Sequence, residues 1–482
     1  MTDAARAFHR RIDTALADGA LRDALALAVG RLADGRKAAM SSMADGEAFR
    51  DEARRIRANA IASLDRHLET FEREATARGC QVHWAETAAD ATRIVAAIAR
   101  DRGVTLAVKS KSMVSEEIEL NAALERAGVR VIETDLGEFV VQLADDRPSH
   151  IITPIIHRTR HDVARLFREK LGATPEDVAD IPAMTAFARR TLRAEFLRAG
   201  MGISGVNLAV AETGTLCVVT NEGNGRLTTS LPRVHVALLG LERIVPTAED
   251  LSIVLSLLAR SATGQALSVY TNLITGPRRR SEGAGRGATG EPDGPEELHV
   301  VVVDNGRSRL LGGTLAEILY CVRCGACLNV CPVYRHIGGH AYGGVYPGPV
   351  GSVVMPGLMG LDDWSELAQA SSLCGACRDV CPVKIDLPHL LLELRRQAAA
   401  KRLAPFWLRA FMPVYAAVVT RPRLYASAGT IAGVLAKFVG RDGWIRRLPG
   451  PLAAWTASRD FPVPEARSFI RQNRDRKREA AR

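Results

Sequence analysis

The chain has 482 residues, of which 47% are hydrophobic and 24% charged, so it is long enough for two or three domains with a sizeable core. The N-terminus contains acidic residues and no apolar run, which excludes an ordinary secretory signal. No apolar run in the chain reaches the roughly 18 residues of a membrane span, which predicts a cytoplasmic protein. The net charge is +10, and residues 401–482 alone carry +12, so the basic character belongs to the tail.

Residues 1–70 are predicted to be helical, because apolar positions recur at intervals of three and four. From residue 71 to about 305, short β-branched runs alternate with helical ones, which predicts an α/β domain with a largely parallel sheet. A helix is expected over Ser115–Ala127, and a long surface loop over 276–296. The predicted strands are Val104–Val108, Val129–Glu133, Ile151–Ile156, Leu208–Val210, Leu216–Thr220, Val234–Leu239 and Leu298–Val303.

Residues 306–395 form a third predicted region, in which seven of the nine cysteines are crowded. The segment contains a repeat, CGACLNVCPV and CGACRDVCPV, which favours metal binding over disulfides in a cytosolic chain. The basic extension 396–482 follows. Its apolar stretches 404–419 and 424–436 are too short and too broken to span a membrane, but they could lie on one or dock onto a partner.

The first cysteine motif has the spacing of bacterial ferredoxins, with Cys321, Cys324, Cys327 and Cys331 followed by Pro332. Three closely spaced thiolates wrap one corner of a cluster, and the fourth thiolate points toward the other cluster. The first cluster is therefore predicted to be [4Fe–4S], with the ligands Cys321, Cys324, Cys327 and Cys381.

The second motif has Ser371 in its first position, so the second cluster is predicted to have only three thiolates, from Cys331, Cys374 and Cys377. Its remaining ligand could be Ser371, His336, His340 or water, and it could be [4Fe–4S] or [3Fe–4S]. Zinc is the usual rival for paired cysteines, but zinc sites do not need a repeated Cys-Pro ending. Cys80 and Cys217 stand outside the motifs and are expected to be buried structural residues.

Polar clusters also fall at predicted strand ends, where α/β sheets place ligands. Lys109, Ser110 and Lys111 precede a predicted helix, so their loop is a candidate anion site, although a capped helix with solvated lysines is equally compatible. Glu222 and Arg226 flank a Gly- and Asn-rich turn and could form a paired polar site. No G-x-G-x-x-G motif follows a strand, so a nucleotide cofactor is not indicated.

The sequence resembles the lactate utilization protein B family, the iron–sulfur component of a three-part bacterial L-lactate oxidation system. The resemblance covers about residues 60–395 and is carried by KSKSMVSEEIELN, ETGTLCVVTNEGNGRL, RSATGQ, DGPEELHVVVVDNGRSRLLG and the two cysteine segments. It implies an α/β LUD domain similar in fold to sugar-phosphate isomerases and CoA-transferases, then a ferredoxin-like dicluster domain and a helical basic tail.

The resemblance further implies an electron-transfer subunit that acts with two other lactate utilization subunits to oxidise lactate to pyruvate, rather than a catalyst alone. The second motif of this family is similarly short by one cysteine, so the resemblance implies that Ser371 is not a departure from the family pattern. The tail could also place the chain at the inner face of the membrane near a quinone; no nucleic acid is expected. The alternative hypothesis is a redox-sensing or scaffold protein whose α/β domain binds an anionic metabolite.

Overall fold

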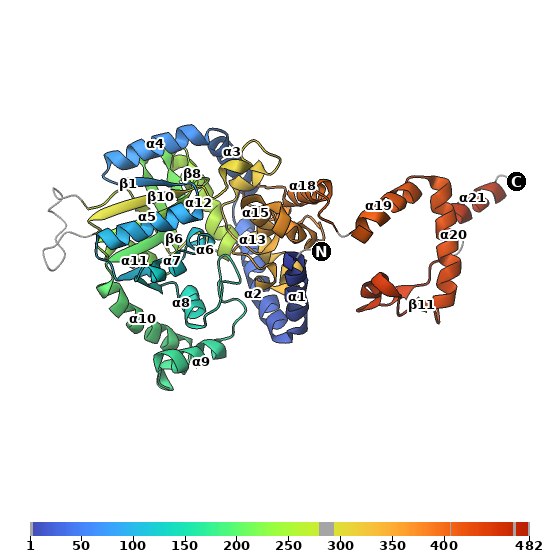
Figure 1. The fold of residues 1–482 in the computed structure, drawn as a ribbon, viewed down its shortest axis with the longest axis horizontal. Helices are drawn as coiled ribbons and strands as arrows, with labels where there is room; N and C mark the ends of the chain where they lie inside the picture. Colours follow the sequence, from blue (N-terminus) through green and yellow to red (C-terminus); the bar gives the residue numbers. More distant parts are fainter. Residues whose placement is uncertain (1–2, 279–293, 405, 466–468, 481–482) are drawn as a thin grey trace. The chain divides into compact units, whose positions relative to one another are not determined.

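The computed structural model describes residues 3–278, 294–404, 406–465 and 469–480. They divide into two compact units, Met1–Lys401 and Arg402–Arg482. Figure 1 shows the first unit as a sheet with helices on both faces, joined to a helical region that contains the cysteines.

The central sheet of the first unit has six strands, and all neighbouring strands are parallel. Its strands are rich in Val, Ile and Leu, and all seven residues of Val234–Gly240 are buried, as expected for a sheet covered on both faces. In spatial order the strands are β1 (Gln81–Ala85), β10 (Glu297–Val303), β7 (Val234–Gly240), β4 (Met201–Gly205), β2 (Leu106–Lys109) and β3 (Arg130–Glu133).

Two apolar cores flank this sheet. One core joins the sheet to α5 (Ala88–Asp101), α6 (Met113–Glu117) and α7 (Leu120–Arg126). The other joins it to α8 (Leu136–Leu143), α9 (Arg160–Leu171) and α10 (Ile181–Arg198). The predicted α/β architecture is thus confirmed.

A second, mixed sheet of four strands continues the first unit. Its central strands β5 and β6 are antiparallel, whereas β5 and β8 are parallel. The sheet is accompanied by α11 (Asn224–Ser230) and α12 (Ala248–Thr263), and its strands are β8 (Ile244–Val245), β5 (Leu208–Val210), β6 (Thr215–Thr220) and β9 (Tyr270–Ile274).

Some sequence-based predictions of local structure were wrong. Ile151–Ile156 forms turns instead of a strand, because the loop closes on itself through the Ser149 N–H, which donates to the Pro154 carbonyl at 2.9 Å. The helix predicted over Ser115–Ala127 is split into α6 and α7 at Glu119, whose φ is 52°. Strands β1, β4, β8 and β9 were not predicted. Within the predicted loop 276–296, residues 279–293 lie outside the described residues.

Four helices precede the α/β domain: α1 (Asp3–Ala17), α2 (Gly19–Ser41), α3 (Gly46–Ala62) and α4 (Leu64–Ala77). Helix α2 contacts both α12 of the α/β domain and α13 (Ala326–Asn329) of the cysteine region, and α3 contacts α12 as well (Figure 1). The N-terminal helices therefore support both parts of the first unit.

The cysteine region consists of short helices separated by loops. Its α15 contacts α13 and α18, so the region has its own packed centre. Its helices are α13 (Ala326–Asn329), α14 (Pro332–Ile337), α15 (Gly348–Met359), α16 (Leu361–Trp364), α17 (Ala376–Asp379) and α18 (Leu387–Ala400).

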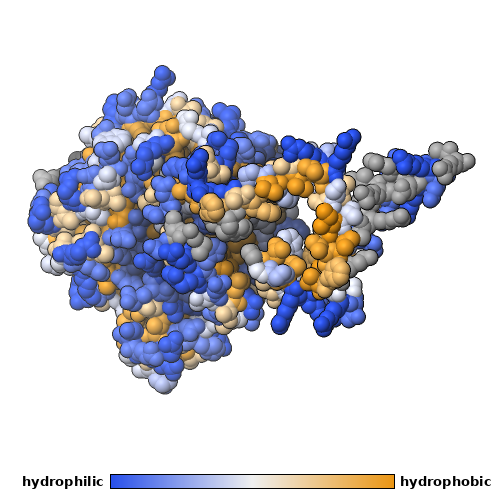
Figure 2. Space-filling view, turned by 45° about the vertical axis from the view of Figure 1, so that its right-hand side comes forward, coloured by the Kyte–Doolittle hydropathy of each residue, from blue (hydrophilic) through white to orange (hydrophobic). Residues whose placement is uncertain are grey.

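The second unit contains α19 (Phe406–Val419), α20 (Pro422–Val439), a two-stranded sheet of β11 (Trp444–Ile445) and β12 (Phe461–Pro462), and α21 (Phe469–Glu479). Many of its large apolar side chains are exposed, among them Phe406 and Phe438 at 76% and 84%. Figure 2 shows such apolar surface on this unit. Within the described ranges, no helix has the length and apolar character that a membrane span requires.

Candidate iron–sulfur centres and the adjoining cavity

The two cysteine loops follow the same backbone path. In the first loop Arg323 and Gly325 have φ values of 55° and 76°, and α13 begins directly afterwards. In the second loop Leu373 and Gly375 have φ values of 54° and 87°, and α17 follows in the same way. The sequence repeat is therefore also a structural repeat.

Backbone N–H groups of these loops point at sulfur atoms. The Arg323 N–H donates to Cys321 Sγ at 3.3 Å, and the Ile385 N–H donates to Cys381 Sγ at 3.4 Å. In the second loop the Leu373 N–H donates to Ser371 Oγ at 3.1 Å, the position that corresponds to Cys321. Such donors offset the negative charge of a ligated sulfur.

Four thiols form a first group: Cys321, Cys324, Cys327 and Cys381. Burial, and next the charge of Cys381, raises the pKa of Cys324 to about 12. Burial, and next the charges of Cys324 and Cys321, raises the pKa of Cys327 well above its usual range. Burial also raises the pKa of Cys381 to about 11, with a further contribution from Cys321. The structure thus brings the last cysteine of the second motif to the first three of the first motif.

The other three motif cysteines form a second group. Burial, and next the charge of Cys331, raises the pKa of Cys377 to about 12. Burial raises the pKa of Cys331, and Cys374 adds to this effect. Cys374 itself is exposed, and a hydrogen bond from the Ala376 N–H lowers its pKa.

All nine cysteines are free thiols, and five of the seven motif thiols are buried. Two compact sets of sulfur donors, with N–H groups directed at them, fit the thiolate ligation of iron–sulfur clusters. Because the buried thiols are neutral without iron, cluster binding must release their protons, which couples assembly to pH. Cys80 and Cys217 are buried away from these groups, as predicted for structural residues, and burial raises the pKa of both, to about 11 and 12.

A cavity of about 470 Å³ lies where the α/β domain meets the first cysteine loop. Ser110 and Lys111, from the loop after β2, line it together with Glu222, from the loop after β6. Val322 and Arg323 close it from the cysteine side. The loops that follow strands β2 and β6 and the first cysteine loop therefore line the same cavity.

Comparisons with known proteins agree with this arrangement. Residues 68–303 match the LUD domain family, and residues 317–385 match the 4Fe-4S dicluster domain family. The chain is 43% identical to Lactate utilization protein B of Macrococcus caseolyticus over 471 residues, which span 96% of this chain and 95% of that protein. The chain belongs to the lactate utilization protein B family.

Two other relatives have a similar sequence identity to this chain. Lactate utilization protein B of Bacillus pumilus is 43% identical, over 96% of both chains. The protein of Escherichia coli named Uncharacterized electron transport protein YkgF is 42% identical, over 96% of this chain and 95% of its own length. These relatives are matched along nearly their whole length, so the similarity includes the C-terminal extension.

In this member of the lactate utilization protein B family, the predicted anion site is only partly assembled. Lys109 is fully buried and its Nζ lies 2.8 Å from Glu116 and 2.7 Å from Glu133. Although burial opposes the charge, these carboxylates raise the pKa of Lys109, so this lysine belongs to an internal ion cluster. Ser110 and Lys111 do line the cavity.

Arg226 does not pair with Glu222, contrary to the sequence-based hypothesis. Its guanidinium lies 5.9 Å from the centre of the Tyr270 ring, at the surface, whereas Glu222 accepts a hydrogen bond from the Leu136 N–H at 3.2 Å. The two side chains therefore have separate partners, which spacing along the chain did not reveal.

His340, a candidate ligand of the second cluster, is engaged elsewhere through Nε2. This atom donates to the Arg147 carbonyl at 2.7 Å and lies 3.7 Å from Asp146 Oδ1. Asp146 also contacts His157, at 3.0 Å, and Arg158. Arg158 already supplies positive charge to this carboxylate, so we describe the group as an ion-pair cluster.

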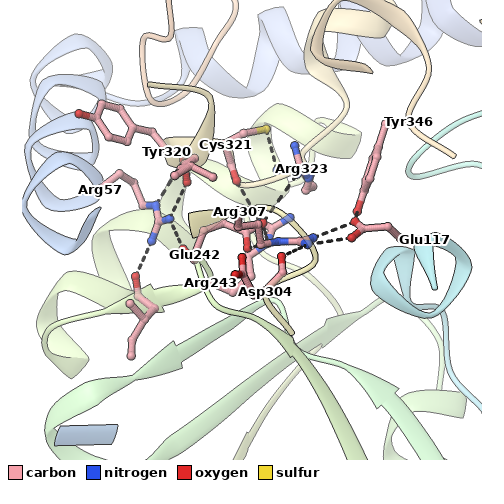
Figure 3. A network of polar contacts seen from close by, with 12 residues as sticks. Arg57, Glu117, Glu242, Arg243, Asp304, Arg307, Tyr320, Cys321, Arg323 and Tyr346 are labelled. Atoms are coloured by element: carbon pink, nitrogen blue, oxygen red, sulfur yellow. Dashed lines mark hydrogen bonds and ion pairs between the residues drawn. The ribbon is translucent and has the colours of Figure 1, made fainter. Parts of the chain in front are cut away.

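A buried network of charges connects the sheet to the first cysteine loop, as Figure 3 shows. Arg307 donates to both oxygens of Glu117, at 2.7 and 2.8 Å, and to Glu242 at 2.7 Å. The Tyr346 hydroxyl donates to Glu117 at 2.7 Å. Arg323 lies 3.7 Å from Glu242. The sequence patterns gave no sign of this network, because its members come from separate segments.

The network has more positive than negative side chains close to Cys321. Arg243 donates to the Cys321 carbonyl at 3.1 Å, and Arg57 donates to the Tyr320 and Leu319 carbonyls at 3.3 and 3.0 Å. Two glutamates, Glu117 and Glu242, face four arginines: Arg57, Arg243, Arg307 and Arg323. Because buried charges need partners, this surplus fits a set of cysteine thiolates held by iron.

Proposed function

We propose that this chain is the iron–sulfur electron-transfer subunit of a multi-subunit system that oxidises L-lactate to pyruvate. The observation that carries this proposal is the grouping of the motif thiols into two sets, one of four and one of three. Lactate utilization is the role in the names of the relatives, and electron transport is in the name of the Escherichia coli protein.

The first set, Cys321, Cys324, Cys327 and Cys381, would hold a [4Fe–4S] cluster. The second set, Cys331, Cys374 and Cys377, would hold a [4Fe–4S] or [3Fe–4S] cluster, with Ser371 as its extra ligand. When bound, the two clusters supply carriers for one electron each, which matches the two electrons released when a 2-hydroxy acid becomes a 2-oxo acid.

The chain's own residues would set the environment of these carriers. Amide donors such as the Arg323 N–H reach the sulfurs directly. Arg50 of α3 donates to the Cys381 carbonyl at 3.1 and 2.9 Å, and Arg36 of α2 donates to the Val380 carbonyl at 2.8 Å. These cations favour the more negative, reduced state of a neighbouring cluster and so raise its potential.

Two other lactate utilization subunits would be the partners, and the apolar surface of α19 and α20 would contact them. The exposed side chains of this surface include Phe411, Tyr415, Ile431 and Leu435. Co-purification of the three subunits should be lost on deletion of residues 402–482. Flotation of the full chain with anionic vesicles, without co-purification, would instead support a peripheral membrane role at a quinone.

A second candidate function is a redox-sensing or scaffold role in which the α/β domain binds an anionic metabolite. The cavity beside the first cysteine loop favours this role, because Lys111, Arg243 and Arg323 line it. The two functions separate in one experiment. The anaerobically purified chain is mixed with its two partner subunits and L-lactate, and cluster reduction is followed by visible absorption and EPR. Reduction that needs all three subunits supports electron transfer, whereas clusters that stay oxidised contradict it.

Genetic complementation gives an independent test. A strain that lacks all three subunits should grow on L-lactate when all three are restored, and should fail when only this chain is omitted. A matched strain that carries Cys327→Ala should also fail, because Cys327 is a buried thiol of the first set and interacts with thiols of both sets. Growth without this chain would contradict the proposed function.

A further inference from the structure

The cavity between the α/β domain and the first cysteine loop has the walls of a ligand site. Its volume of about 470 Å³ lies in the range of small-molecule pockets. It opens at the carboxyl end of β2, where open α/β sheets bind ligands. Val322 and Arg323 belong to its wall, and both follow Cys321 directly in the chain.

Two buried polar side chains of this wall have hydrogen-bonding atoms without a partner. Ser110 is 5% exposed, and its Oγ makes no hydrogen bond. Arg323 is 9% exposed, and its Nε and Nη1 make none. Because buried polar atoms are nearly always paired, the Ser110 hydroxyl is available to a ligand or a water that enters the cavity, whereas Arg323 also faces Glu242 and the Tyr346 ring.

Lys111 adds a cation that makes no direct ion pair with a carboxylate of the described residues, although its charge acts to lower the pKa of Glu138 and Glu222, which burial raises. Its Nζ donates to the Ile152 carbonyl at 2.7 Å, and within the described ranges no carboxylate lies within 4.0 Å of it. Arg243 also lines the cavity, and its Nε lies 3.5 Å from Glu242. The lining thus contains three cationic side chains, Lys111, Arg243 and Arg323, and two carboxyl groups, Asp135 and Glu222. The excess of positive charge suits an anion.

The remaining walls favour an organic anion over an inorganic one. Ile152, Val218 and Leu258 supply apolar surface, and Glu222 and Asn207 supply separate polar groups. A ligand with a carboxylate, an alkyl part and a second polar substituent would contact the cationic, the apolar and the polar side chains of the lining. A fully hydrated inorganic ion would leave the apolar surface unused.

We propose that this cavity binds a small organic carboxylate of the 2-hydroxy or 2-oxo acid class, held by Lys111 and Ser110 against the loop that carries Cys321. The choice of this acid class rests on the proposed function. The cavity is larger than a three-carbon acid requires, so longer 2-hydroxy acids should also fit. A ligand bound there would sit beside the first cluster.

The test uses the full-length, cluster-loaded protein under anaerobic conditions. Binding of L-lactate, pyruvate and inorganic phosphate is measured by calorimetry, and the EPR spectrum of the reduced protein is recorded with and without each of them. We expect pyruvate or L-lactate to bind and to change the EPR spectrum. The variant Lys111→Gln should weaken binding by about tenfold to a hundredfold, and Ser110→Ala by about tenfold.

Arg226→Gln is the matched control, because Arg226 is a nearby cation that lies outside the cavity. It should leave the affinity unchanged, and unchanged visible absorption shows that each variant retains its clusters. Equal affinity of Lys111→Gln and the parent protein would overturn the proposal, as would binding of phosphate alone or of nothing.

The experiments distinguish failure of the cavity proposal from failure of the proposed electron-transfer function. If the three-subunit system with Lys111→Gln oxidises lactate normally and this chain binds neither acid, the cavity proposal is wrong and electron transfer stands. If the chain binds pyruvate with the expected variant effects but lactate oxidation does not need it, the cavity proposal stands and the proposed function is wrong.

Discussion

Ser371 Oγ accepts a hydrogen bond from the Leu373 N–H at 3.1 Å, and Cys321 Sγ accepts the equivalent bond from the Arg323 N–H at 3.3 Å. The serine oxygen therefore occupies the place of a cysteine sulfur in the repeated loop. The second motif therefore has one sulfur fewer than the first, but its loop has the same backbone path.

Ser371→Cys should complete the second thiolate set without a change of loop. We expect the reduced variant to show the EPR signal of two [4Fe–4S] clusters and to lose any [3Fe–4S] signal of the oxidised parent protein. Iron analysis and EPR of the anaerobically purified proteins measure this. Ser372→Cys, one position away in the same loop, is the control, and an identical effect of both variants would contradict the role of Ser371.

Arg50→Gln should lower the reduction potential of the first cluster, on the order of 50 mV, because it removes a cation that donates to the Cys381 carbonyl. A redox titration followed by EPR measures the change. Arg55→Gln is the control, since Arg55 is exposed on the same helix and pairs with Glu52. Equal potentials in Arg50→Gln and the parent protein would show that this arginine acts only on the fold.

Glu117→Gln should destabilise the first unit by about 3 kcal/mol, because it leaves the buried Arg307 without one of its two carboxylate partners. Thermal unfolding of the cluster-loaded protein gives the effect as a lower Tm. Glu125→Gln, at an exposed position of α7, should leave the Tm within about 1 °C. A stable Glu117→Gln variant would mean that the network is not needed for folding.

Glu222→Gln should change how stability depends on pH. Burial, and next the charge of Asp135, raises the pKa of Glu222 to about 7. The folded state therefore holds a proton that the unfolded state releases near pH 4.5, so this residue destabilises the protein progressively as pH rises from about 4.5 to 7. The variant should gain stability relative to the parent over that interval. Denaturant unfolding at pH 5, 6 and 7 measures the difference, and a constant difference would contradict the shift.

The proposed ligand grouping could be predicted from spacing, because a C-x2-C-x2-C-x3-C-P run can wrap a cluster in only a few ways. The strands at 104–108, 129–133, 234–239 and 298–303 were also predictable, since strands buried on both faces are continuous apolar runs. Local patterns failed where tertiary contacts decide the backbone. Residues 151–156 have the composition of a strand, but they form turns beside the cysteine region.

The sequence by itself determined the iron–sulfur chemistry, the α/β class and the serine at the first position of the second motif, because these depend on residue type and spacing. Only the tertiary structure decided which lysine is available to a ligand. Lys109 ends β2 and enters an internal cluster with Glu116 and Glu133, whereas Lys111, two residues later, reaches the cavity. Side-chain direction depends on the local backbone path after the strand, and a one-dimensional pattern does not contain that path.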